Sequence, residues 1–146
     1  MVIKRDFLFT SAKYEDLMGR RILAVDEKFY ATDHAMRRAV TGGNVRRDID
    51  RTLEAVVYRE FLRRGYDVRI GRIKEKEVDF VCERGNERIY VQVAYLMESE
   101  ETREREFSAL MAVPDQYPKM VLTLDRVDFS SNGISHKYLP DFLMES

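Results

Sequence analysis

The stretch K-E-V-D-F-V-C-E-R-G-N-E-R-I-Y-V-Q-V-A-Y, residues 76–95, decides the fold. Hydrophobic residues alternate with their neighbours on both sides of Gly85-Asn86, over residues 78–82 and again over 89–95. Alternation with a period of two is typical of strands, and a Gly-Asn pair between two such runs is typical of a tight hairpin turn. The stretch therefore predicts a β-hairpin.

The register of this hairpin brings a carboxylate and an amide together. If Gly85-Asn86 is the whole loop, the numbers of opposed residues sum to 171, so Asp79 lies opposite Gln92 on a shared face. By the same register, Glu77 lies opposite Ala94. Directly opposed Cβ atoms are about 4.5 to 5.5 Å apart, close enough for Asp79 and a neighbouring group to hold one cation. Asp79 and Gln92 are therefore candidate site residues.

A long helix is predicted before the hairpin. From about Asp50, apolar residues recur at i, i+3, i+4 and i+8, and Gly65 ends the pattern. The apolar stripe consists of Leu53, Val56, Val57 and Phe61. Glu54 and Glu60 border this stripe. Either both carboxylates reach water or pair with arginines at helical spacing, or Glu54 reaches over the hairpin and joins Asp79.

The remaining patterns predict an α/β fold with one compact unit. Strands are expected at 66–70 and 119–124, a second helix at 96–113, and an edge strand with a closing turn at 134–143. Since strand, helix and strand follow one another, the third and fourth core strands should be parallel. Residues 48–146 thus form a mixed four-stranded sheet in the order α-β-β-β-α-β, with helices packed on it. Residues 1–47 form a small N-terminal extension with short strands at 7–10 and 19–30 and a helix at 34–40.

The composition predicts one ordinary globular domain. The chain has 146 residues, of which 45% are hydrophobic and 35% charged, with a net charge of −1. No apolar run is long enough to cross a bilayer and no signal peptide opens the chain, so we expect a cytoplasmic protein without a membrane partner. The single cysteine, Cys82, is expected to be buried. No G-x-x-x-x-G-K-[ST] loop is present, so this chain should not hydrolyse ATP, and no cofactor is expected.

The hairpin resembles the PD-(D/E)XK nuclease fold. In that superfamily an Asp on one strand is followed, on the next, by an acid, one spacer residue and a Lys. The resemblance maps Glu54, Asp79 and Gln92 onto the acidic positions, with Asp79 and Glu54 as ligands of Mg²⁺ or Mn²⁺ if the site is active. Ala94 stands where the lysine would be, which implies a degenerate active site.

Ordered blocks along the chain also resemble the uncharacterised C-terminal domain of archaeal and bacterial AAA-type ATPases. The blocks are R-D-I-D-R-T-L-E-A-V-V-Y-R-E-F-L-R-R-G-Y-D-V (47–68), K-E-V-D-F-V (76–81), I-Y-V-Q-V-A-Y-L (89–96), E-T-R-E-R-E-F (101–107), Y-P-K (117–119) and D-F-L (141–143). The Q-V-A-Y form is similar to the branch of that family that lacks the nuclease lysine. In that family an ATPase module usually precedes this domain, and we expect this sequence, which resembles the domain alone, to be either an excised domain or the product of a truncated gene.

Three hypotheses follow. The first is a noncatalytic module that binds a nucleic acid or a protein, such as an ATPase module of the same family. The second is a divalent-metal-dependent DNA nuclease in which Lys74 or Lys76 has migrated to supply the ammonium. The third is a structural domain that assembles with itself into a homo-oligomer or docks onto its ATPase module.

Overall fold

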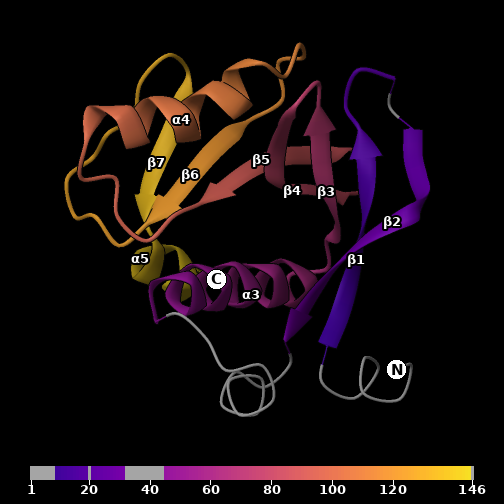
Figure 1. Ribbon diagram of the computed structural model, residues 1–146, viewed down its shortest axis with the longest axis horizontal. Helices are drawn as coiled ribbons and strands as arrows, with labels where there is room; N and C mark the ends of the chain where they lie inside the picture. The colour runs from indigo at the N-terminus through magenta and orange to yellow at the C-terminus, as the bar shows by residue number, and fades with distance from the viewer. Residues whose placement is uncertain (1–8, 20, 32–44, 146) are drawn as a thin grey trace.

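The computed structural model describes residues 9–19, 21–31 and 45–145, which form a seven-stranded sheet with helices packed on both faces (Figure 1). The elements are β1 (Phe9–Asp16), β2 (Arg21–Ala31), α3 (Val45–Arg63), β3 (Asp67–Ile73), β4 (Lys76–Arg84), β5 (Glu87–Val93), α4 (Glu100–Met111), β6 (Lys119–Thr123), β7 (Ile134–Tyr138) and α5 (Leu139–Met144). The fold is mixed α/β, as predicted. None of the helices in these ranges is long and apolar enough to span a membrane.

The sheet is larger than the sequence predicted. Its strand order is β2-β1-β3-β4-β5-β6-β7, so the four expected core strands, β3 to β6, lie side by side at its centre. The pairs β1/β2, β3/β4 and β4/β5 are antiparallel, whereas β1/β3, β5/β6 and β6/β7 are parallel. The edge strand expected within 134–143 is confirmed as β7, beside β6. The rest of the enlargement was not predicted, because β1 pairs with β3, which is remote in sequence, and this pairing adds the N-terminal strands to the same sheet.

The N-terminal region also differs locally from the prediction. The strand expected at 7–10 extends instead from Phe9 to Asp16, and the two strands expected within 19–30 are one long strand, β2. A register shift between Lys13 and Tyr14 of β1 breaks the alternation of faces along this ribbon. Ile22, near the start of β2, is 49% exposed. The helix expected at 34–40 lies outside the described residues.

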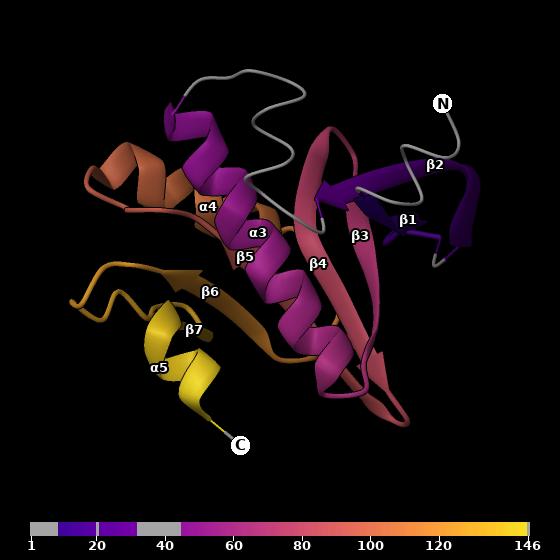
Figure 2. The same ribbon diagram turned by 90° about the horizontal axis from the view of Figure 1, so that it is seen from below.

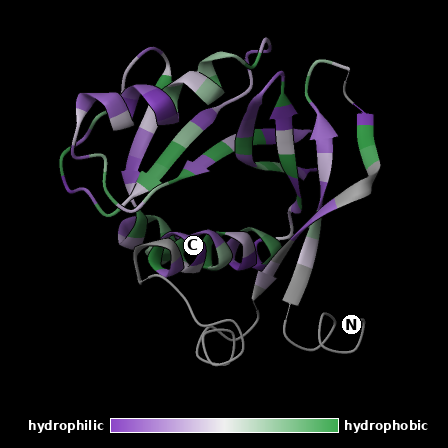
Figure 3. Cartoon of the chain, viewed as in Figure 1, coloured by the Kyte–Doolittle hydropathy of each residue, from purple (hydrophilic) through white to green (hydrophobic). Residues whose placement is uncertain are grey.

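Two helix layers enclose two apolar cores. Buried side chains of α3 and α5, among them Val57, Phe61 and Phe142, form one core with one face of the sheet. Phe107 and Leu110 of α4 form the other core with the opposite face. Figure 2 shows α3 running across the central strands with α5 beside β6 and β7, and Figure 3 shows hydrophobic residues gathered on the strands between the helix layers.

The helix ends follow local sequence signals. Gly65 takes a φ of 88° just after α3, and its N–H donates to the carbonyl of Leu62, so the predicted glycine stop is confirmed. The second helix is shorter than expected because Ser99 caps it by accepting a hydrogen bond from the Thr102 N–H at 3.1 Å. The preceding Met97 N–H instead donates to Asp125 Oδ2 at 2.7 Å. Side-chain acceptors thus set where α4 begins.

One extra residue in β4 distinguishes its two halves. Arg69 pairs with Val81 and Gly71 with Val78, so three steps along β4 match two along β3. Because of this bulge, Val78 and Val81 both pack in the α4 core, whereas Phe80 belongs to the α3 core. Gly71 lies directly beside the bulge, and a Cβ there would come within 2.7 Å of the Leu17 side chain. The close packing at this point requires glycine.

Charged side chains on the face that carries α4 form a set that we call the arginine network, consisting of Glu15, Arg69, Glu83 and Arg88 from four neighbouring strands. Glu15 and Arg88 are 3% and 7% exposed and form a direct ion pair. Glu83 accepts from Arg69 at 2.8 Å and from Arg88 at 2.7 Å. Two guanidinium groups therefore balance the two less exposed carboxylates, Glu15 and Glu83, while Arg69 also contacts the exposed Asp67 at 2.6 Å.

Candidate functional site

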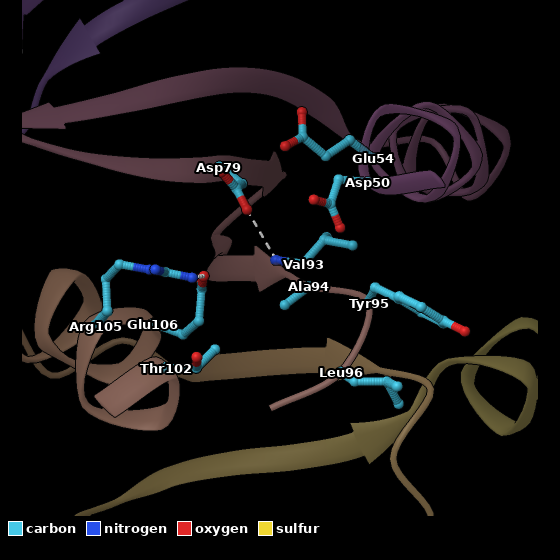
Figure 4. Close-up of a pocket in the computed structure, with 10 residues that line it drawn as sticks. All are labelled: Asp50, Glu54, Asp79, Val93, Ala94, Tyr95, Leu96, Thr102, Arg105 and Glu106. Carbon is cyan, nitrogen blue, oxygen red and sulfur yellow. Dashed lines mark hydrogen bonds and ion pairs between the residues drawn. The ribbon is translucent and has the colours of Figure 1, made fainter. Parts of the chain in front are cut away.

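A pocket of about 220 Å³ opens where β5 ends, between α3 and α4 (Figure 4). Four carboxylates line it, those of Asp50, Glu54, Asp79 and Glu106. The first two project from α3, Asp79 comes from β4 and Glu106 from α4, as the close-up shows. Two of the candidate acids, Glu54 and Asp79, thus line the same pocket although one lies on a helix and the other on a strand.

The hairpin register places Asp79 where the sequence predicted. The ladder pairs Arg84 with Glu87 and continues to Phe80 and Val91, so all opposed numbers sum to 171. Gly85 takes a φ of 59° in the two-residue turn. Beyond the ladder, the N–H of Val93 donates to Asp79 Oδ2 at 2.9 Å. The carboxylate is therefore fixed to the end of β5.

Gln92 is adjacent to Asp79, but its amide is already used by the protein. Its Oε1 accepts from the Asp79 backbone N–H at 2.6 Å, and its Nε2 donates to Glu106 Oε2 at 3.4 Å. The side chain is 5% exposed and does not line the pocket. Although Gln92 stands opposite Asp79, it therefore does not share a cation with the Asp79 carboxylate. Sequence alternation alone could not show this, because it gives the register of the two strands and not the hydrogen bonds of their side chains.

Glu54 forms an ion pair with a residue that the sequence did not single out. Lys28 of β2 brings its Nζ within 3.2 Å of Glu54 Oε2 and within 2.9 Å of Glu77 Oε1. The hydroxyl of Tyr14 donates to the other oxygen of Glu77 at 3.3 Å. We call Lys28, Glu54, Glu77 and Asp79 the Lys28 cluster. No local motif surrounds Lys28, so only the tertiary packing of β2 reveals it.

Glu60, the second acid that borders the apolar stripe of α3, pairs with arginines at helical spacing, which is the first of the two predicted alternatives. Arg63 and Arg64 donate to its Oε2 at 2.6 and 2.7 Å. These hydrogen bonds, first those from Arg63, lower the pKa of Glu60 to about 2. Glu60 is therefore paired with two arginines of its own helix and its following turn, whereas Glu54 is paired with Lys28 of β2.

The carboxylates of the pocket are held in an unfavourable electrostatic environment. Burial raises the pKa of Asp79 well above its usual value, and the charge of Glu54 adds to the effect. Burial also raises the pKa of Glu54 and of Glu106, and Lys28 opposes the shift only in part at Glu54. Burial lowers the pKa of Lys28, but Glu54 and Glu77 outweigh it, so this pKa is raised. The carboxylates that line the pocket thus carry more negative charge than the nearby cationic side chains neutralise.

A buried tyrosine lies next to the Lys28 cluster. The ring of Tyr30 stacks on Tyr58 of α3 with the centroids 4.5 Å apart, and its hydroxyl has no hydrogen-bond partner among the described residues. Burial raises the pKa of Tyr30, and the charges of Glu54 and Asp79 raise it further. Tyr30 therefore stays protonated and presents a buried donor near the carboxylates.

The donor set does not fit a divalent metal ion well. Within the described ranges, no three His, Cys, Asp or Glu side chains come together as a metal-binding group. Lys28 already contacts Glu54, and the Gln92 oxygen accepts a backbone hydrogen bond. A Mg²⁺ or Mn²⁺ ion needs several free oxygen ligands around one point, and these acids do not supply them.

The lysine positions considered from the sequence lie apart from the pocket. Lys74 and Lys76 are both exposed at the turn between β3 and β4 and neither lines the pocket. Ala94, by contrast, is part of the pocket wall, so the position that a nuclease lysine would take is present and carries a methyl group. Arg105 of α4 also lines the pocket, but its side chain is 71% exposed and lies 3.5 Å from Glu106.

Comparison with known proteins gives one relative without a known activity. The chain is 33% identical over 145 residues to an uncharacterised protein of Haemophilus influenzae. The match covers 99% of this chain but 35% of that protein, so the chain spans about a third of the length of this relative. No family model matches the chain, and no solved structure matches it.

Proposed function

We propose that this chain is a noncatalytic module with a degenerate PD-(D/E)XK nuclease-like core, similar to the C-terminal domain of AAA-type ATPases, and that it binds a partner. The observation that carries the proposal is the hydrogen bonding of the Gln92 side chain. Both ends of its amide are engaged inside the protein, with the Asp79 N–H and with Glu106. A residue satisfied in this way stabilises the hairpin and is not free to bind a metal ion or water.

A second observation supports the absence of nuclease chemistry. Hydrolysis of a phosphodiester needs positive charge near the developing negative charge of the transition state. Ala94 supplies none, and the exposed lysines at 74 and 76 lie outside the pocket. Arg105 lines the pocket, but its side chain is 71% exposed and lies 3.5 Å from Glu106. The site therefore keeps the scaffold of an acidic hairpin without the groups that would activate water.

The charge of the pocket favours a protein partner over a nucleic acid. Four carboxylates and one cationic side chain, Arg105, line the pocket in the described part of the chain. A phosphate backbone would be repelled there, whereas a basic or neutral protein surface would not. An ATPase module of the same family is the partner we propose.

The competing function is a metal-dependent DNA nuclease with a relocated lysine. One observation favours it, because Lys28 does bring an ammonium next to Glu54. That ammonium is bound between two carboxylates, however, at 2.9 and 3.2 Å. In this position it neutralises the acids and is not available to a substrate phosphate.

The proposal is tested by assaying the purified chain against linear and branched DNA with Mg²⁺ or Mn²⁺, beside Asp79→Asn. We expect the two proteins to give the same background cleavage. Cleavage by the unmodified chain that disappears in Asp79→Asn would establish the nuclease function instead. Light scattering on the same samples separates a monomeric module from a self-assembling one.

A further inference from the structure

His136 of β7 is a buried histidine that the proposed function does not use. It is 6% exposed, and both of its ring nitrogens have hydrogen-bond partners. Nδ1 accepts the backbone N–H of Phe129 at 3.0 Å. Since Nδ1 therefore carries no proton, the neutral ring has its proton on Nε2, which donates to Thr123 Oγ1 at 2.8 Å.

The contacts around the ring agree with this tautomer and attach the preceding segment to it. The Thr123 hydroxyl donates to Asp125 Oδ2 at 2.8 Å, so its oxygen is left to accept from His136. The backbone N–H of His136 donates to Ser130 Oγ at 2.8 Å. Residues 124–133, which we call the β6–β7 loop, are thus held by His136 both through its ring, at Phe129, and through its backbone, at Ser130.

Phe129 forms part of the wall of a groove along α4. The groove has a volume of about 400 Å³, and Phe107 and Met111 of α4 also line it. The Phe129 ring stacks on the His136 ring with the centroids 5.6 Å apart, and the Arg103 guanidinium of α4 lies 4.7 Å from the Phe129 centroid. The position of Phe129 in this wall therefore depends on His136, through one ring contact and one hydrogen bond.

We propose that His136 is a pH-sensitive switch, which holds Phe129 in place while its ring is neutral and releases Phe129 from the groove wall when the ring is protonated. A protonated ring donates from both nitrogens, so its Nδ1–H and the Phe129 N–H would be two donors facing each other. The two groups must then separate. Because β7 is fixed by its ladder with β6, the β6–β7 loop is the part that moves.

The charged groups around His136 set the conditions for this step. Burial lowers the pKa of His136 below its ordinary value of about 6.5, so the ring is neutral at pH 7. Asp125, Asp128 and the Val127 carbonyl oppose this shift, and from α4 Arg103 faces the Phe129 ring. The other charged side chains that line the small pocket beside His136 are Arg126, Lys137, Asp141 and Glu145. We therefore expect protonation at mildly acidic pH, where the two aspartates stabilise the imidazolium.

The experiment is an NMR titration of the full chain between pH 8 and pH 5, in which the His136 ring signals and the hydrogen exchange of the Phe129 amide are measured together. We expect the protection factor of this amide to fall about fivefold or more as the ring takes up its proton, because the amide loses its acceptor. The Leu124 amide is the internal control, since it donates to the Tyr95 carbonyl at 2.8 Å, which does not titrate. The methyl signal of Met111, in the same groove, should shift with the midpoint of the His136 ring.

Two variants separate His136 from the other groups that titrate in this range. His136→Asn offers an oxygen to the Phe129 N–H but cannot take up a proton, so its Phe129 protection and Met111 signal should not change with pH. His34→Asn, which removes the other histidine of the chain, should respond like the unmodified protein.

Circular dichroism establishes that each variant is folded, and if His136→Asn does not fold, the titration of the unmodified protein is decisive by itself. Phe129 protection that stays constant while the His136 ring is protonated would overturn the inference. A ring that stays neutral down to pH 5, or the same fall in protection in folded His136→Asn, would also overturn it.

Discussion

The arginine network and the Lys28 cluster are two sets of charged side chains on opposite faces of one sheet, and they are built in opposite ways. In the arginine network, Arg69 and Arg88 hold two carboxylates through several hydrogen bonds. In the Lys28 cluster, a single ammonium faces three carboxylates, and a fourth, Glu106, lies in the same pocket. Balanced charges tie strands together, whereas unbalanced charges are costly to keep and mark a site retained for another reason.

The largest effect on stability should come from a substitution that breaks the arginine network. Arg88→Met would leave Glu15, 3% exposed, without its closest counter-ion. Loss of one partner of a buried pair typically costs about 3 to 5 kcal/mol, so we expect a fall of that size in the free energy of unfolding, measured in urea. Arg88→Met with Glu15→Gln should recover much of the loss. A single variant as stable as the unmodified protein would show that the network does not hold the sheet.

A substitution in the Lys28 cluster should have a smaller effect of the opposite sign, a gain in stability. Asp79→Asn removes a charge that burial disfavours but keeps an oxygen for the Val93 N–H. The gain in stability at pH 7 should be on the order of 1 kcal/mol, as for other substitutions that relieve strain at functional positions. Glu75→Gln, at an exposed position in the neighbouring turn, is the control and should change little. A loss of stability in Asp79→Asn would contradict the description of this site.

The same comparison predicts a pH dependence. Since the folded-state pKa values of Asp79 and Glu54 are raised, the folded protein binds protons that the unfolded chain has released. The contribution of these groups to stability is thus greatest below the ordinary carboxyl pKa of about 4 and is lost as the pH rises from there toward the raised values. Urea unfolding between pH 4 and pH 8 should show a shallower decline for Asp79→Asn than for the unmodified protein. If the free energy of unfolding declined with pH at the same slope in both proteins, Asp79 would ionise in the folded protein as it does in the unfolded chain.

The smallest effect is expected at the exposed lysines. Lys76→Ala should change stability by less than about 0.5 kcal/mol and leave Mn²⁺ affinity unaltered, because Lys76 lies outside the pocket. Urea unfolding and calorimetry check the two parts. A changed Mn²⁺ affinity would support a role in the site for the lysines of the β3–β4 turn.

The sequence predicted those parts of the molecule that depend on neighbours in the chain. The hairpin register followed from Gly85-Asn86, and the end of α3 from Gly65, because turn and cap residues act locally. Local chemistry was sufficient for these features. Helix periodicity placed Glu54 beside the apolar stripe, but its pairing with Asp79 was suggested by the nuclease resemblance, and both residues line the pocket.

The parts that were missed depend on pairing between distant segments. Nothing near Tyr14 indicates that it pairs with Ile70, so the extension of the sheet by β1 and β2 was not predicted. The role of Lys28 was missed for the same reason, since it exists only once β2 packs against α3. The hydrogen bonds of the Gln92 amide were not predicted either, because one of them joins it to Glu106 of α4, which is brought near β5 only by the fold.

The bulge in β4 has a consequence for how this site could be lost or moved. Three residues of β4 occupy the length of two in β3 between Val78 and Val81. Deleting Asp79 would remove the extra residue, and Val78 would still pair with Gly71 while Glu77 kept its direction toward Lys28. The loss of this single codon would therefore remove the central acid of the site and leave the strand on either side of it in register.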